Sequence, residues 1–119
     1  MARFRLSRWA EADIARILAT SAERWGTDGR RRYAALLTAA LRRIAAAPEG
    51  PATRERADLM AGVRSLHIRH VRCGPEAAVR RPVHVVFYRA VAPDLIEIAR
   101  VLHERMEPRR HLEPEVDND

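Results

Sequence analysis

Five side chains at alternating positions in the second half of the chain could together do chemistry on a phosphodiester. They are His67, Arg69, His84, Tyr88 and Glu97. Histidine and glutamate can transfer protons, while arginine and tyrosine can stabilise charge that develops on a phosphate. Because alternate residues of a strand face the same side, these five could share one open face of a sheet. The solvated face of any half-exposed sheet carries similar residues, so an ordinary polar surface is the competing interpretation.

Other catalytic and ligand-binding motifs are missing from the sequence. It has no glycine-rich phosphate loop, no His-Glu-x-x-His zinc helix and no serine nucleophile elbow. The single cysteine, Cys73, lies in a Cys-Gly-Pro turn and cannot form an internal disulfide. The histidine pairs His67/His70 and His103/His111 each lack a third ligand at suitable spacing. The sequence therefore predicts no metal, no cofactor and no small-molecule substrate.

A basic segment near the C-terminus, residues 103–112, could serve as a contact surface instead. Pro108 disfavours helix at Glu107, so a turn or a broken helix is expected there. Arginine makes bidentate contacts with acidic groups, and methionine adapts to irregular surfaces. The candidates for target binding are Arg105, Met106, Arg109, Arg110, His111 and Leu112. The alternative is a solvated segment whose Leu112 packs against the domain, and the residues alone do not favour either interpretation.

The charge of the chain favours an acidic partner. All 22 basic residues are arginine, and four of the 16 acidic residues lie in residues 113–119, so residues 1–112 carry a net charge of +10. Such a field attracts nucleic acid or an acidic protein segment. No apolar run approaches the roughly 20 residues of a membrane span, and no secretory signal is visible. We therefore expect a cytoplasmic protein that does not associate with membranes.

The elements that must position these side chains can be read from hydrophobic periodicity and turn residues. Residues 2–6 alternate as a short strand, and Ser7 can cap a helix that closes at Gly26. A second helix starts at Thr27 or Asp28 and runs to about residue 47, before Pro-Glu-Gly-Pro. Residues 52–62 are polar and are expected to form a surface loop. Strands are predicted over residues 63–71, 79–89 and 95–102.

This order predicts an α+β fold, β-α-α-β-β-β, with an N-terminal helical hairpin packed on a mainly antiparallel sheet. Residues 1–112 form a single domain, and residues 113–119 form an acidic tail that is expected to be disordered. Strand alternation assigns seven residues to the face that packs on the helices: Leu66, Ile68, Val83, Val85, Phe87, Ile96 and Ile98. The opposite, open face then collects His67, Arg69, His84, Val86, Tyr88, Glu97 and Val101.

The chain resembles the ParE branch of the RelE/ParE toxin superfamily over about residues 3–112, and the order of elements agrees. The resemblance begins with Phe4, Leu6, Ser7, Ala10, Asp13, Ile14 and Ile17, and continues through Trp25-Gly26, the helix of Tyr33, Leu37 and Leu41, Pro48 and Gly62-Val63-Arg64. Its most specific parts are residues 86–89 (Val-Phe-Tyr-Arg), residues 96–103 (Ile-Glu-Ile-Ala-Arg-Val-Leu-His), Arg105-Met106 and residues 109–112 (Arg-Arg-His-Leu).

The resemblance implies a toxin of a type II toxin–antitoxin system, with a RelE/ParE-like fold. ParE-like toxins are associated with inhibition of DNA gyrase without catalysis of their own, and a ParD-like antitoxin neutralises them. The resemblance does not identify the antitoxin-binding residues. It does give the charge of residues 1–112 a role, because an acidic antitoxin segment could fold onto a basic surface.

Two alternatives stay open at this point. RelE-like toxins instead cut mRNA on the ribosome, often with a C-terminal tyrosine. Here no tyrosine follows Tyr88, and Leu112 follows His111, which disfavours the ribonuclease. If the chain were such a ribonuclease, its catalytic residues would be His67, Arg69, His84, Tyr88 and Glu97. The second alternative is a toxin fold that has lost its activity and survives as a binding partner.

Overall fold

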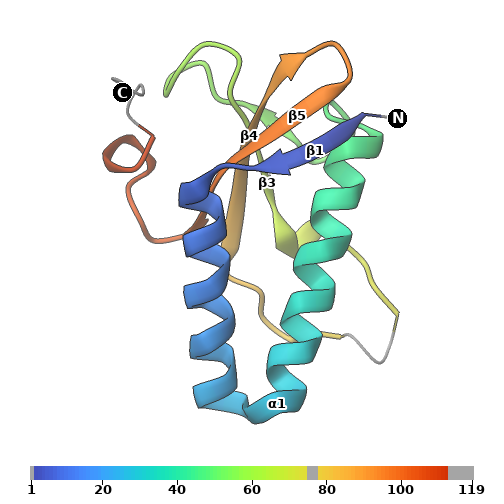
Figure 1. Ribbon diagram of the computed structural model, residues 1–119, viewed down its shortest axis with the longest axis vertical. Helices are drawn as coiled ribbons and strands as arrows, with labels where there is room; N and C mark the ends of the chain where they lie inside the picture. The colour runs from blue at the N-terminus through green and yellow to red at the C-terminus, as the bar shows by residue number, and fades with distance from the viewer. Residues whose placement is uncertain (1, 75–77, 113–119) are drawn as a thin grey trace.

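Two helical arms cover one face of a five-stranded sheet (Figure 1). The computed structural model describes residues 2–74 and 78–112. In chain order the elements are β1 (Arg3–Leu6), α1 (Arg8–Ala46), β2 (Arg54–Glu55), β3 (Arg64–His67), β4 (His84–Ala92) and β5 (Leu95–His103), with short 3₁₀ helices at Ile68–His70 and Pro108–Arg110. The sheet order is β1-β5-β4-β3-β2. The predicted α+β class is confirmed.

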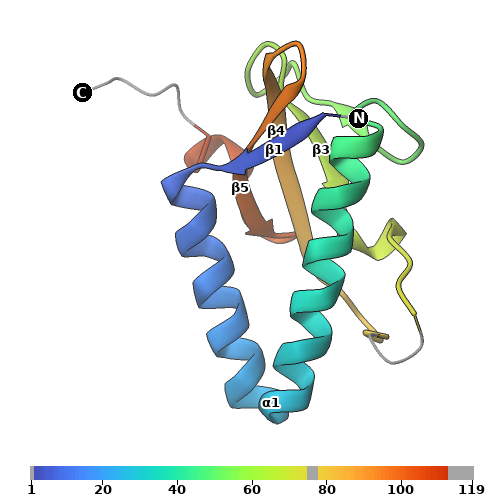
Figure 2. The same ribbon diagram turned by 45° about the vertical axis from the view of Figure 1, so that its right-hand side comes forward.

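The helical hairpin is confirmed, and its hinge is Gly26. Ser7 caps α1, because its Oγ accepts a hydrogen bond from the Ala10 N–H at 3.0 Å. The helical path is then broken at Gly26, with φ 76° and ψ −175°, a conformation open essentially only to glycine. Residues 8–25 and 27–46 therefore run side by side in opposite directions (Figures 1 and 2).

The sheet is antiparallel except for its first strand. β3, β4 and β5 form the predicted antiparallel meander, while β1 pairs with β5 in parallel through Phe4 and Ile96. Three strand boundaries differ from expectation. The loop predicted at residues 52–62 contains β2, the strand predicted over residues 63–71 ends at His67, and the strand predicted over residues 79–89 begins at His84 and extends to Ala92. The tail at residues 113–119 lies outside the described residues.

The assignment of β4 to the two faces of the sheet was wrong. Val86 and Tyr88 pack into the core with the helices, whereas Phe87 belongs to a second cluster on the opposite face and Val85 packs against that cluster. Alternation could not show which residues of β4 face the helices, because both faces of the strand are apolar. Pairing settles it, since Leu66 of β3 lies opposite Val86 and both face the helices.

A β-bulge explains a second error, the placement of Val101 on the open face. Phe87 pairs with Arg100 but Tyr88 pairs with Ile98, so β5 contains one additional residue, Ala99. Ile98 and Val101 therefore both face the helices, although they are three residues apart. Ser7 supports the bulge, because its Oγ donates to the Ala99 carbonyl at 2.8 Å and its N–H donates to the Ile98 carbonyl at 3.0 Å.

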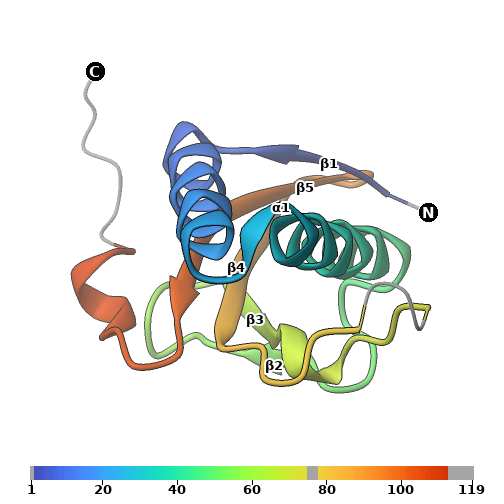
Figure 3. The same ribbon diagram turned by 90° about the horizontal axis from the view of Figure 1, so that it is seen from below.

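The second face of the sheet is partly covered, which was also not expected. Val63, Phe87, Leu102 and Leu112 are buried together there. Seen from below, the two arms lie on one side of the sheet, and the segment after β5 and the loop before β3 lie on the other (Figure 3). Within residues 2–74 and 78–112, no helix is both long and apolar enough to cross a membrane.

Candidate functional site

Two of the five candidate catalytic residues, His84 and Tyr88, are part of the packing between sheet and helices. His84 Nδ1 lies 2.6 Å from the hydroxyl of Tyr33 in α1, and that hydroxyl also accepts the Val83 N–H at 3.2 Å. The Tyr33 hydroxyl thus joins both His84 and Val83 to α1. The pKa of His84 is lowered to about 4, mainly by burial and to a smaller extent by the nearby His103 and His67. The His84 ring is therefore neutral at pH 7.

Tyr88 is 1% exposed, and its hydroxyl donates to the Pro48 carbonyl just after α1. Burial raises the pKa of this phenol. Tyr88 therefore joins the sheet to the end of the helical layer and does not face solvent.

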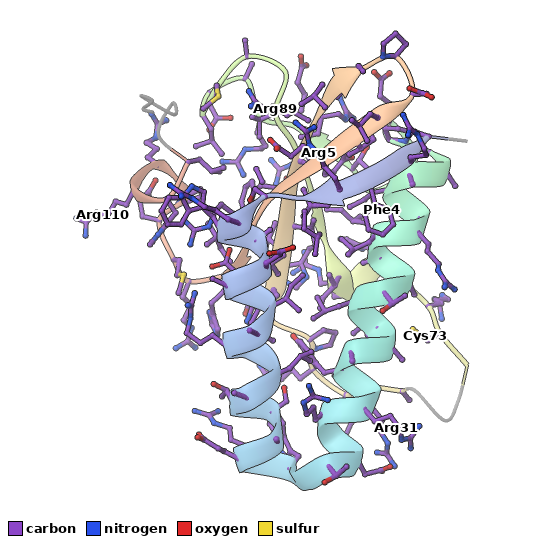
Figure 4. All side chains as sticks on the ribbon, in the orientation of Figure 1. Phe4, Arg5, Arg31, Cys73, Arg89 and Arg110 are labelled. Carbon is purple, nitrogen blue, oxygen red and sulfur yellow. The ribbon has the colours of Figure 1, made fainter. Side chains whose placement is uncertain are left out.

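Glu97 lies elsewhere, in a row of charges across three strands. Its carboxylate is 3.4 Å from Arg5 of β1 and 3.5 Å from Arg89 of β4. Figure 4 shows Arg5 and Arg89 at the same end of the sheet. Such a row is typical of cross-strand charge pairing. The structure therefore does not bring the five residues together.

His67 and Arg69 do lie together, in a cleft on the second face of the sheet. The cleft has a volume of about 190 Å³ and lies between β2 and β3 on one side and the residues after β5 on the other. His67 accepts the Arg69 N–H at Nδ1, so its Nε2 carries the proton that is shared with Glu104 at 2.7 Å. This hydrogen bond lowers the pKa of Glu104.

Residues outside the five candidate catalytic residues complete the cleft. Arg54 and Arg56 line it from β2 and the turn beyond, His70 lines it from the 3₁₀ helix, and His103 lines it from the end of β5. The signal for the first two is the alternation in Thr-Arg-Glu-Arg, residues 53–56, which lies in the predicted surface loop. No group of three His, Cys, Asp or Glu side chains in the part of the chain that the structure describes could hold a metal ion.

The predicted contact segment turns back on the sheet after β5. We call residues 104–112 the C-terminal segment. Arg105, Met106, Arg109 and Arg110 are exposed, His111 is half-buried and Leu112 is buried. The break at Pro108 is confirmed, because a turn at residues 104–106 precedes a 3₁₀ helix at Pro108–Arg110. The Leu112 side chain therefore anchors the segment and is not part of its exposed surface.

A buried ion pair between Arg100 and Asp13 supports the end of the C-terminal segment. Arg100 Nε and Nη2 donate to the two carboxylate oxygens of Asp13, each at 2.8 Å, and Arg100 Nη1 donates to the His111 carbonyl at 3.1 Å. Asp13 is 1% exposed and also accepts the Val101 N–H at 2.9 Å. Burial raises the pKa of Asp13, but the hydrogen bonds from Arg100 and Val101 and the charges of Arg100 and Arg16 outweigh it, so the net shift is downward.

Comparison with known proteins identifies relatives along nearly the whole chain. A family model described as the ParE toxin of the type II toxin–antitoxin system parDE matches residues 4–108. Toxin ParE1 of Caulobacter vibrioides is 38% identical over 112 residues, which cover 94% of this chain and 99% of that relative. All the residues of the cleft and residues 104–108 of the C-terminal segment therefore fall within the family match.

Proposed function

Because the chain belongs to the ParE toxin family of type II toxin–antitoxin systems, we propose that it inhibits DNA gyrase and is held inactive by a ParD-like antitoxin. The proposed activity needs no catalysis by the chain itself, and its target implies action in the cytoplasm. Residues 1–112 would form the toxin domain, and the acidic residues 113–119 would be a tail outside it.

We place the contact with gyrase on the C-terminal segment, and one observation carries this proposal. The segment presents Arg105, Arg109 and Arg110 to solvent, while Leu112 and the bond from Arg100 to the His111 carbonyl hold its backbone. Arginines on an ordered backbone can make bidentate contacts with little loss of conformational entropy. The pairing of Arg109 with Asp58 and Glu107, at 4.0 and 3.9 Å, is loose enough to be exchanged for contacts with a target.

The antitoxin would use a different surface. Phe4 on β1 and Trp9 at the start of α1 are 36% and 45% exposed, and β1 is an edge strand of the sheet. An acidic, amphipathic antitoxin segment could pack on these apolar side chains while the net positive charge of the toxin accelerates association. Separate surfaces would allow variants of the C-terminal segment to keep antitoxin binding.

The structure does not favour ribosome-dependent cleavage of mRNA as a second function. That alternative needs His67, Arg69, His84, Tyr88 and Glu97 around one phosphodiester. His67 and Arg69 line the cleft, but His84 Nδ1 and the Tyr88 hydroxyl are bonded to the helical layer, and Glu97 pairs with arginines of β1 and β4. A translation assay in which the toxin leaves ribosome-bound mRNA intact would agree with this placement.

Purified toxin should be added to DNA gyrase with relaxed or supercoiled plasmid. We expect loss of supercoiling or accumulation of cleaved DNA, and preincubation with the cognate antitoxin should abolish either effect. No change in gyrase activity at stoichiometric toxin would contradict the proposal. Growth arrest on expression without the antitoxin distinguishes an active toxin from an inactive toxin fold.

A further inference from the structure

We propose that the cleft on the second face of the sheet binds the phosphate backbone of single-stranded nucleic acid. The cleft is separate from the helical core, and two exposed arginines of its lining, Arg54 and Arg69, are not part of the gyrase contact proposed above. The inference goes beyond gyrase inhibition and does not depend on it.

The side chains of Arg54, His67 and Arg69 follow one line along the second face of the sheet. Arg54 lies directly opposite Ser65 in the pairing of β2 with β3, so both side chains face the same side. His67 follows Ser65 at the next position on that face, and Arg69 follows His67 in the 3₁₀ helix. Alternate residues of a strand are about 6.6 Å apart, a spacing that successive phosphates of an extended backbone can match. The line thus has an exposed arginine at either end, Arg54 and Arg69, with His67 hydrogen-bonded to Glu104 between them.

The arginines of this line are available to a ligand. Arg54 and Arg69 are exposed, and none of the acidic side chains in residues 2–74 and 78–112 forms an ion pair with either. Arg56 is partly occupied, because it donates to both carboxylate oxygens of Asp58 at 3.1 Å. Unpaired guanidinium groups in a cleft are typical of phosphate-binding surfaces, because arginine donates bidentately to phosphate oxygens.

The described lining residues include one acidic side chain, Glu104, and three arginines, Arg54, Arg56 and Arg69. Glu104 is held by the Nε2–H of His67 at 2.7 Å, and its side chain is 39% exposed at the rim. His70 and His103 also line the cleft and supply further ring nitrogens. With three arginines against one carboxylate in the lining, the local balance of charge is positive.

The floor and wall of the cleft favour a single strand over a duplex. Phe87 and Val85 of β4 form an apolar floor, and Met106 forms part of the far wall. A volume of about 190 Å³ can accept part of one nucleotide at a time but not the width of a double helix. Phe87 is 3% exposed, so the floor offers apolar contact and not a ring for stacking, and phosphate contacts would supply most of the binding to a single strand, with little dependence on sequence.

The test is fluorescence anisotropy of labelled eight-nucleotide oligomers, oligo-dT and oligo-U, with a double-stranded DNA of the same length as a third ligand. The full-length toxin is titrated at several salt concentrations, without gyrase or antitoxin. We expect both single strands to bind more tightly than the duplex. The ratio of the two single-strand affinities distinguishes DNA from RNA as the source of the backbone. Failure to bind either single strand, or tighter binding of the duplex, overturns the proposal.

The decisive variant is Arg54→Gln with Arg69→Gln, and its control is Arg24→Gln with Arg30→Gln. The four arginines are exposed, so each double substitution removes two positive charges without disturbing the core. The control pair lies next to the bend of α1, which projects away from the sheet (Figure 1). We expect the cleft variant to bind about tenfold more weakly and the slope of log K against log salt to fall by about 1.4.

The control variant should keep most of the affinity. Equal weakening by both variants would show that only the overall charge attracts the oligomer, and this overturns the assignment to the cleft. Because the assay contains no gyrase, its failure leaves the gyrase proposal standing, and the reverse also holds.

Discussion

Asp13 and Arg100 form a bidentate ion pair between α1 and β5, with both contacts at 2.8 Å, although the two residues are 87 positions apart in the sequence. Arg100 uses its remaining Nη1 to hold the His111 carbonyl. One buried carboxylate thus joins the helical layer, the β-bulge and the C-terminal segment.

Replacing Asp13 by alanine should destabilise the fold strongly. The substitution leaves the Arg100 guanidinium, whose side chain is 17% exposed, without its partner and removes the acceptor for the Val101 N–H. Loss of one member of a buried pair costs about 3–5 kcal/mol. Urea unfolding followed by circular dichroism measures the change. The matched control is Arg16→Gln, because Arg16 also contacts Asp13 but is 60% exposed, and we expect it to cost less than about 1 kcal/mol. Equal losses in the two variants would contradict this account.

The free energy of unfolding should fall between pH 6.5 and about pH 4 because of His84. Its pKa is depressed from 6.5 to about 4 in the folded chain, so across this window the unfolded chain binds a proton that the folded chain does not. Stability is therefore complete above pH 6.5 and decreases as the solution is acidified. A shift of this size corresponds to about 2–3 kcal/mol once partial exposure is considered.

Urea unfolding at pH 7.5, 5.5 and 4.5 would measure this dependence. His84→Gln should flatten it, whereas His111→Gln should not. His70 has the same direction of pKa shift but is exposed. Asp13 cannot account for the slope, because its pKa is lowered below 3.8 and its contribution is lost only in more acidic solution. A slope that persists in His84→Gln would assign the effect to other groups.

Leu112→Ala should reduce gyrase inhibition although it removes no charged group. Leu112 is 7% exposed and packs with Val63, Phe87 and Leu102, so its loss releases the end of the C-terminal segment. We expect a stability cost of about 1–3 kcal/mol together with weaker inhibition. Met106→Ala is the control for stability, since Met106 is 41% exposed and should cost less than about 0.5 kcal/mol. Full inhibition by Leu112→Ala would show that anchoring is not required.

The triple variant Arg105→Ala, Arg109→Ala and Arg110→Ala should abolish growth arrest while leaving stability and antitoxin binding largely unchanged. All three side chains are exposed, so the core is untouched. The control triple Arg24→Ala, Arg30→Ala and Arg42→Ala removes the same charge from exposed positions of α1 and should remain toxic. Equal loss of gyrase inhibition and antitoxin binding, measured by calorimetry, would instead place the antitoxin on the C-terminal segment.

The sequence alone determined the helical hairpin and the order of the elements other than β2, which was predicted as a loop. Ser7 supplies a side-chain acceptor that caps the start of a helix, and Gly26 adopts a backbone conformation that essentially only glycine tolerates. Both signals are local and do not depend on the rest of the chain. The resemblance to ParE toxins rested on the same kind of information, since motif order is a property of the sequence.

Only the tertiary structure decided how the two faces of the sheet are used. The run Val85–Tyr88 is apolar on both faces, so alternation could not fix its phase, and the bulge at Ala99 reversed the phase of β5 beyond it. The same holds for Asp13, because only the folded chain brings Arg100 against this helix residue. It also holds for Arg54 and Arg69, because strand pairing is what brings them to one cleft. Local preference fixes which kind of element forms, whereas contacts between distant residues fix where the strands end and which side chains meet.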